Sequence, residues 1–212
     1  MTFMKVCGIT RASDAYHAVR HGASALGFVF WPQSPRYIAP DKAAIIISEL
    51  QDNIQTVGVF VDQAPKEISR VVSETGISMV QLHGDETPEF CSQVGLPVIK
   101  AFRISPNFNY TLLHLYDVYS FLFDTYVDGK YGGTGNTFNW DLVKSNQNDI
   151  PIILSGGLNV KNIKKGINQV SPSCVDVNSG IESSPGKKDE QKMKALYNIL
   201  KNIDAIDNMY KT

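Results

Sequence analysis

The sequence predicts an α/β protein in which eight parallel strands close into a (β/α)8 barrel. Two observations lead to this prediction. Short runs rich in β-branched and aromatic residues alternate with amphipathic stretches along the 212 residues, and several of the runs are almost continuously apolar, as strands buried on both faces of a parallel sheet are. Eight such repeats in this length fit a barrel near the lower size limit of the fold. Alternation alone also fits a doubly wound open sheet, which is the alternative architecture.

The expected strands are short apolar runs separated by turn residues. They cover residues 3–7, 25–30, 55–61, 78–83, 97–102, 120–124, 151–155 and 174–178. The expected helices cover residues 13–22, 39–51, 64–76, 87–95, 159–170 and 189–203. Ser13 is a candidate N-cap and Gly22 a candidate C-cap, and three helices show Pro near their start. We expect no long helix over residues 105–118 and a weak helix over residues 139–147.

Composition indicates the class of protein and its partners. Hydrophobic residues make up 43% and charged residues 19% of the chain, which predicts a packed core. No linker or low-complexity segment divides the chain, so we expect one domain over residues 1–212. The net charge of -1 gives no support for nucleic-acid binding. No apolar run approaches the roughly 20 residues that span a bilayer. Residues 1–10 show neither the apolar stretch nor the cleavage site of a signal peptide, so we expect none. We therefore expect no membrane partner and a cytoplasmic location.

The three cysteines lie far apart in the sequence. An odd count in a cytosolic chain argues against disulfides, and the absence of Cys-x-x-Cys argues against a metal site. We expect Cys91 and Cys174 to be core residues. Cys7, at the end of the first strand, could be a core residue, a metal ligand, half of a disulfide or a reactive thiol.

Residues suited to chemistry fall at the predicted carboxyl ends of strands, where barrel enzymes place their active sites. Cys7 ends the first strand, Gln81 and His83 end the fourth, and Asp124 ends the sixth. Asp124 follows an apolar run, where desolvation raises the pKa of a carboxyl and suits it to be a general acid. An N-cap or an ion pair is the other interpretation, and Asp128 is a rival acid. His83 could be an acid, a base or a polar rim residue.

Two glycine-containing turns predict a phosphate site. Gly156 and Gly157 follow the seventh strand, and Ser179 and Gly180 follow the eighth. Such turns let backbone N–H groups approach a phosphate in barrels, although turn geometry alone can also require glycine.

Two further loops can each be interpreted as functional or as purely structural. Arg36 lies in the stiff loop "WPQSPRY", and its planar guanidinium suits a carboxylate or phosphate; a surface salt bridge is the alternative. The Gly-rich residues 129–138 could form a lid or a plain surface loop, but not a Walker motif.

Taken together, these stretches resemble the phosphoribosylanthranilate isomerase family of tryptophan biosynthesis. The matching segments occur in order over nearly the whole chain: "KVCGIT", "ALGFVFWPQSPRYI", "VGVFV", "VQLHGDE", "VIKAFRI", "FDTYVDGKYGGTGNTFNW", "ILSGGLN" and "VDVNSGIESSPGKKD". "CGIT", "FWPQSPRY" and "QLHGDE" together are far more specific than any single glycine motif.

The resemblance implies a (β/α)8 barrel that uses no cofactor and no metal. Its reaction is an Amadori rearrangement of N-(5-phosphoribosyl)anthranilate to the deoxyribulose 5-phosphate, so the expected partner is a phosphorylated small molecule. The resemblance makes Asp124 the acid and Cys7 the base, with Arg36 on the anthranilate carboxylate. Cys7 would act as a thiolate if its pKa fell from about 8.5, with Gly8 leaving room for substrate. We expect a monomer or a homodimer.

The resemblance also implies places for the remaining rim residues. The two glycine turns would hold the ribose phosphate. Gln81 and His83 would lie near the sugar or the aromatic ring.

Two positions depart from the family pattern. Asn139 replaces an aspartate and should still cap the following helix; Asn178 replaces a serine beside the expected phosphate turn. Two other functions stay open from the residues. Another phosphate-binding barrel, such as indole-3-glycerol-phosphate synthase, would need a rim lysine paired with a glutamate, whereas Lys5 and Lys100 lie inside strands. A non-catalytic barrel that binds a phosphorylated ligand is the second alternative.

Overall fold

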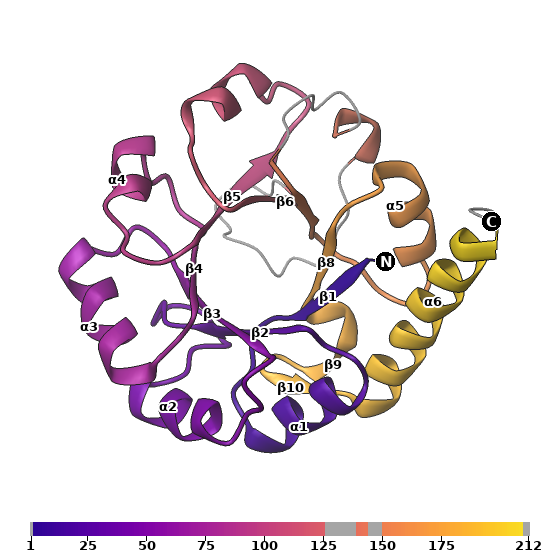
Figure 1. Ribbon diagram of the computed structural model, residues 1–212, viewed down its shortest axis with the longest axis horizontal. Coiled ribbons are helices and arrows are strands. Elements are labelled where there is room, and N and C mark those ends of the chain that lie inside the picture. The colour runs from indigo at the N-terminus through magenta and orange to yellow at the C-terminus, as the bar shows by residue number, and fades with distance from the viewer. Residues whose placement is uncertain (1, 126–138, 144–149, 210–212) are drawn as a thin grey trace.

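The computed structural model describes residues 2–125, 139–143 and 150–209. Its centre is a closed barrel in which the strands β1 to β8 follow one another in chain order. Every neighbouring pair is parallel, and β1 pairs with both β2 and β8, which closes the ring. The predicted barrel is therefore confirmed, and the open-sheet alternative is wrong. Figure 1 looks into the ring of strands, with the helices arranged around it.

The eight strands agree with the predicted runs to within about two residues at each end. They are β1 (Phe3–Val6), β2 (Ala25–Val29), β3 (Gln55–Phe60), β4 (Met79–Leu82), β5 (Val98–Ile104), β6 (Ser120–Thr125), β7 (Ile152–Leu154) and β8 (Cys174–Val177). Most of their residues are buried on both sides of the sheet, which is why the runs are apolar throughout rather than alternating.

Helices cover the outside of the barrel in the described chain (Figure 1). The α-helices are α1 (Ala12–Arg20), α2 (Pro40–Ser48), α3 (Pro65–Thr75), α4 (Pro88–Ser92), α5 (Ile163–Val170) and α6 (Glu190–Met209). Short 3-10 helices are η1 (Tyr110–Leu115), η2 (Trp140–Leu142) and η3 (Ser179–Ile181). A small antiparallel pair that the sequence did not predict, β9 (Glu182–Ser184) and β10 (Lys187–Lys188), follows η3.

The helix ends confirm some cap predictions and correct others. Proline occupies the first turn of α2, α3 and α4, as predicted. The Ser13 N-cap is wrong, because α1 already begins at Ala12 and Arg11 occupies the cap position. The C-cap of α1 is His21, and Gly22 follows it with a φ of 84°. The side chain of Asn139 accepts a hydrogen bond from the backbone N–H of Asp141 at 3.1 Å, which confirms it as a cap.

The structure also describes residues 105–118 and part of residues 139–147, where the sequence predicted little or no helix. Residues 105–118 contain no long helix, only the six-residue η1. The expected weak helix over residues 139–147 is the three-residue η2 in its described part, and residues 144–149 lie outside the described residues. Helix α4 ends at Ser92, earlier than expected.

Alternation along β1 separates the packing core from the interior cavity. Met4 and Val6 point outward and join the large core between the barrel and the helices. Lys5 and Cys7 point the other way, into the barrel. The lower interior is filled by apolar side chains of other strands, among them Val57, Ile99 and Leu122. The inside of the barrel therefore holds a packed apolar core, and the candidate functional residues lie at the carboxyl ends of the strands.

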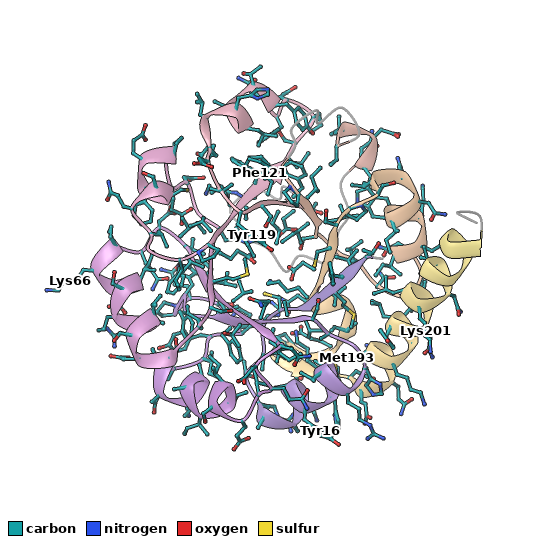
Figure 2. All side chains as sticks on the ribbon, in the orientation of Figure 1. Tyr16, Lys66, Tyr119, Phe121, Met193 and Lys201 are labelled. Carbon is teal, nitrogen blue, oxygen red and sulfur yellow. The ribbon has the colours of Figure 1, made fainter. Side chains whose placement is uncertain are left out.

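The remaining cysteines and the outer surface fit this arrangement. Cys91 is buried in the outer core, as expected, whereas Cys174 is only half-buried against the inner cluster. Figure 2 shows Lys66 pointing away from the ring, and Tyr16 on α1 is 62% exposed. Within the described chain, no helix is both long and apolar enough to cross a membrane.

Candidate active site

A cavity of about 370 Å³ opens at the carboxyl ends of the barrel strands. All nine site residues predicted from the sequence line it: Cys7, Arg36, Gln81, His83, Asp124, Gly156, Gly157, Ser179 and Gly180. Trp31, Ser155, Asp176 and Asn178 also line it. The structure therefore brings together residues from five strand ends and the loop after β2, as the barrel topology requires.

Cys7 is fixed directly above the end of β1. Its backbone N–H donates to the carbonyl of Val177 at 2.9 Å, which continues the ladder with β8. The thiol is 4% exposed and packs with Val29 and Val59. Burial raises the pKa of Cys7, and the nearby charges of Lys5 and Lys188 only partly oppose this. The sequence left the direction of this pKa shift open, because it does not reveal how completely the thiol is removed from water.

Asp124, near the end of β6, faces His83 across the cavity. Its Oδ2 lies 3.3 Å from Nε2 of His83, and its Oδ1 accepts the backbone N–H of Thr125 at 2.7 Å. Gln81 Nε2 lies 2.8 Å from His83 Nδ1. An amide N–H donating there leaves the proton of a neutral imidazole on Nε2, facing the carboxyl. Among the described residues, Gln81 Oε1 and His83 Nε2 are buried without a hydrogen-bond partner.

Arg36 is held from below by Glu182, which sequence reasoning missed. Nε donates to Oε1 at 2.9 Å, and Nη2 donates to Oε2 at 2.7 Å. Arg36 is 8% exposed, so the surface salt-bridge alternative is wrong. Lys188 also donates to Glu182 at 2.8 Å. Burial opposes the charge of Glu182, but hydrogen bonds from Arg36 and attraction by Lys188 hold its pKa below the ordinary value.

Asn178 belongs to the same group of side chains. Its Oδ1 accepts a hydrogen bond from Lys188 Nζ at 2.8 Å. A Cβ on Gly8 would lie 2.8 Å from Arg36 Cδ and 2.9 Å from Asn178 Oδ1. Gly8 has a φ of 73°, so glycine is required there by backbone shape and by these two neighbours. The structure thus gives room for protein side chains as one reason for Gly8, and room for substrate stays a prediction.

The two glycine turns form one concave edge of the cavity. Gly156 and Gly157 have φ values of 85° and 63°, which favour glycine. A Cβ on Gly180 would lie 1.9 Å from the carbonyl oxygen of Leu158, so the turns pack directly on each other. Among the described residues, no hydrogen bond uses the N–H of Gly156, Gly157, Ser179 or Gly180. These unused donors suit an anion.

Two charged residues inside the barrel were missed as parts of the site. Lys5 Nζ donates to Asp176 Oδ1 at 2.7 Å, and Ser155 Oγ donates to Asp176 Oδ2 at 3.1 Å. Lys5 is 1% and Asp176 5% exposed. A charged residue in the middle of an otherwise apolar strand is the signal that could have revealed both.

Lysine–glutamate pairs are present after all. Lys100 lies 2.7 Å from Glu86 and Lys188 lies 2.8 Å from Glu182, but none of these four residues lines the cavity of about 370 Å³. The Lys100–Glu86 pair lines a separate pocket beside Arg103 and Tyr116. The Gly-rich segment 129–138 and the rival acid Asp128 lie outside the described residues.

A closed (β/α)8 barrel with a thiol, a carboxyl and an edge of backbone N–H groups around one cavity is typical of barrel enzymes for acid–base chemistry on phosphorylated small molecules. The family model "N-(5'phosphoribosyl)anthranilate (PRA) isomerase" matches residues 4–199. The N-(5'-phosphoribosyl)anthranilate isomerase of Nitrosospira multiformis is 46% identical over 197 residues, covering 91% of this chain and 93% of that protein. The chain belongs to the N-(5'-phosphoribosyl)anthranilate isomerase family.

Solved structures agree with this assignment. The phosphoribosyl anthranilate isomerase of Thermus thermophilus is similar with a TM-score of 0.88 and 36% identity, covering 95% of this chain and all (100%) of that one. A second isomerase was solved with reduced 1-(o-carboxyphenylamino)-1-deoxyribulose 5-phosphate; its TM-score is 0.81 and its identity 37%, with 95% and 100% coverage. This chain is therefore an isomerase of tryptophan biosynthesis.

Proposed function

We propose that Cys7 and Asp124 are the base and the acid that convert N-(5'-phosphoribosyl)anthranilate to 1-(2-carboxyphenylamino)-1-deoxyribulose 5-phosphate. The observation that supports this most is their placement: a buried thiol and a buried carboxyl open into the same cavity of about 370 Å³ from the ends of β1 and β6. One sugar between them presents its ring oxygen to one group and its C2 proton to the other.

The first step opens the ribose ring. Asp124, in its carboxylic acid form, donates its proton to the ring oxygen, and the C1–O bond breaks to leave a hydroxyl and a protonated Schiff base at C1. Asp124 becomes a carboxylate. His83, 3.3 Å away through Nε2, is in place to stabilise that charge.

The second step moves the proton of C2. The Cys7 thiolate removes it, the C2 electrons form the C1–C2 double bond, and the Schiff base nitrogen is neutralised. The resulting enolamine takes a proton at C1 and loses the proton of its C2 hydroxyl, which gives the ketone. These two transfers restore the thiolate and the carboxylic acid, so protons balance over the cycle.

Substrate binding divides between the two charged ends of the molecule. The ribose phosphate would lie against the N–H groups of Gly156, Gly157, Ser179 and Gly180. The anthranilate carboxylate would meet Arg36. Glu182 accepts hydrogen bonds from Nε and Nη2 of Arg36, and Nη1 makes no hydrogen bond to another described residue. Nη1 is therefore the group that could donate to a substrate carboxylate. We expect a phosphorylated small molecule as the ligand and a monomer or homodimer in solution.

The test is the loss of anthranilate-type fluorescence. Substrate is made in place from anthranilate and phosphoribosyl pyrophosphate by a separate transferase, with EDTA present. Wild type should consume it rapidly, whereas Cys7→Ala and Asp124→Asn should be slower by about 100- to 10,000-fold each. Cys91→Ala is the matched control, because that thiol is buried outside the cavity.

Other results would select another account. Equal turnover in wild type and both variants would keep the enzyme and reject this acid–base pair. No turnover by folded wild type, with retained binding of the phosphorylated ligand, would favour a non-catalytic barrel. Release of carbon dioxide when 1-(2-carboxyphenylamino)-1-deoxyribulose 5-phosphate is supplied as the substrate would favour the indole-forming ring closure instead.

A further inference from the structure

The Lys5–Asp176 ion pair lies inside the barrel directly below the site. Lys5 and Cys7 are two residues apart on β1 and point to the same side of the strand. Nζ of Lys5 donates to Asp176 Oδ1 at 2.7 Å, and Asp176 is held in turn by Ser155 Oγ at 3.1 Å. The lysine head group therefore has one fixed position, and its stem has no route to solvent because the residue is 1% exposed.

Gly27 on β2 shows how closely the ammonium and the thiol approach. A Cβ at this glycine would lie 2.7 Å from Cys7 Sγ and 3.1 Å from Lys5 Nζ. Both atoms thus pack against the same bare α-carbon. The absence of a side chain at Gly27 leaves the space in which the two groups meet.

A buried ion pair is a poor way to stabilise a core. Taking both charges out of water is expensive, and apolar side chains of similar size are often as stable or more so. Most of the neighbouring interior positions, such as Val57 and Ile99, are apolar. A charged pair at this one place, next to a reactive group, therefore points to function.

We propose that Lys5 is a positioning residue for catalysis: its ammonium group, fixed by Asp176, keeps Cys7 available as a thiolate. This inference rests on the proposed role of Cys7 as the base. Lys5 does not take the substrate proton itself. It places a positive charge beside a sulfur that is only 4% exposed, where burial disfavours a thiolate.

The charges around Cys7 agree with this role. Burial raises the pKa of the thiol. The charge of Lys5 is the foremost opposing influence, Asp176 raises the pKa, and the charge of Lys188 and then a hydrogen bond from Lys5 lower it. Burial also opposes the charge of Lys5, yet Asp176 and Cys7 raise its pKa above the ordinary value, so it stays positive. Arg36, His83 and Asp124 line the same cavity but do not share the contact at Gly27.

The experiment measures the thiol directly. The rate of alkylation of Cys7 by iodoacetamide is followed against pH, with the modified peptide quantified by mass spectrometry, in wild type, Lys5→Met and Lys100→Met. Lys100 is the matched control: it is also buried and paired, 2.7 Å from Glu86, but away from Cys7. Lys5→Met should raise the apparent pKa of Cys7 by a unit or more, making alkylation near neutral pH about tenfold slower. Lys100→Met should match wild type.

The pH dependence of kcat/KM should shift together with the pKa of the Cys7 thiol. The value of kcat/KM in Lys5→Met should fall about tenfold near neutral pH and recover as pH rises, and Lys5→Arg should retain most activity. If Lys5→Met does not fold, the double variant Lys5→Met/Asp176→Asn removes both charges and should still raise the thiol pKa.

An unchanged thiol pKa in folded Lys5→Met, or an equal change in Lys100→Met, would overturn the inference. A shifted thiol pKa with an unshifted kcat/KM profile would support the Lys5–Cys7 interaction but reject Cys7 as the base. The two proposals therefore fail in different ways.

Discussion

Arg36, which lines the active-site cavity, forms a bidentate ion pair with Glu182. Nη2 of Arg36 lies 2.7 Å from Oε2 of Glu182, and Nε lies 2.9 Å from Oε1. The pair joins the loop after β2 to the first residue of β9. It leaves Nη1 as the edge of the guanidinium available to a carboxylate.

Replacing Glu182 should therefore damage binding more than chemistry. Glu182→Gln keeps the shape but removes the charge that aims Arg36, so KM for the substrate should rise about tenfold with a smaller change in kcat. Steady-state kinetics by fluorescence measures both. Glu67→Gln, which breaks an exposed pair with Arg70, should leave KM unchanged. A fall in kcat at constant KM would contradict this account of Arg36.

Gly8 should tolerate no side chain. Gly8→Ala places a Cβ 2.8 Å from Arg36 Cδ in a backbone with a φ of 73°, so we expect a loss of about 1–2 kcal/mol of stability and a raised KM. Gly76→Ala separates the two effects, because Gly76 has a φ of 68° and a Cβ placed there would have nothing within 4 Å. It should lose similar stability in urea unfolding and keep its KM. Equal kinetics in both variants would show that Gly8 does not position Arg36.

His83 should act on Asp124 through its Nε2 proton. Because the amide of Gln81 donates to Nδ1 at 2.8 Å, the ring should carry its hydrogen on Nε2, which nitrogen-15 NMR of the imidazole can detect. His83→Asn should lower kcat about tenfold. His17→Asn, on a half-exposed pair with Glu190, is the control and should behave as wild type. A ring protonated on Nδ1 would contradict this arrangement.

Stability should fall above about pH 8.5, the ordinary pKa of a cysteine. Burial raises the pKa of Cys91 to about 11 and that of Cys174 to about 12. Above the ordinary value the unfolded chain has lost these protons and the folded chain has kept them, so the free energy of unfolding decreases as pH rises towards the folded values. The slope for one cysteine is at most about 1.4 kcal/mol per pH unit.

Urea unfolding near about pH 8 and about pH 10 measures this loss. Cys174→Ser removes one of the titrating groups, so this variant should lose less stability than wild type between the two pH values. Because Tyr and Lys residues titrate equally in both proteins, the difference reports on Cys174. An identical loss in both would contradict the sign of this effect.

The strands and the cavity residues could be predicted because each depended on local signals. The apolar character and the short length of runs such as residues 120–124 both predict strands. A barrel brings the carboxyl ends of its strands together whatever the detailed packing. This is why Cys7, His83 and Asp124 meet although they are far apart in sequence.

The supporting shell could not be predicted in the same way. Glu182 and Lys188 lie on the short strands β9 and β10, which have no apolar run to reveal them. Lys5 and Asp176 meet through the register of β1 with β8, a pairing 171 residues apart. The raised pKa of Cys7 depends on its three-dimensional burial. The N-cap of α1 lies two residues before the predicted Ser13, a difference that propensity does not resolve.

The most direct test of the central claim assigns each residue to its own step. Substrate carrying deuterium at ribose C2 is compared with ordinary substrate in wild type, Cys7→Ser and Asp124→Asn, and the isotope effect on kcat is measured. If Cys7 removes the C2 proton, Cys7→Ser should make that step limiting and increase the isotope effect. If Asp124 opens the ring, Asp124→Asn should make ring opening limiting and bring the effect towards unity. The reverse pattern, or the same isotope effect in both variants, would contradict the assignment of base and acid.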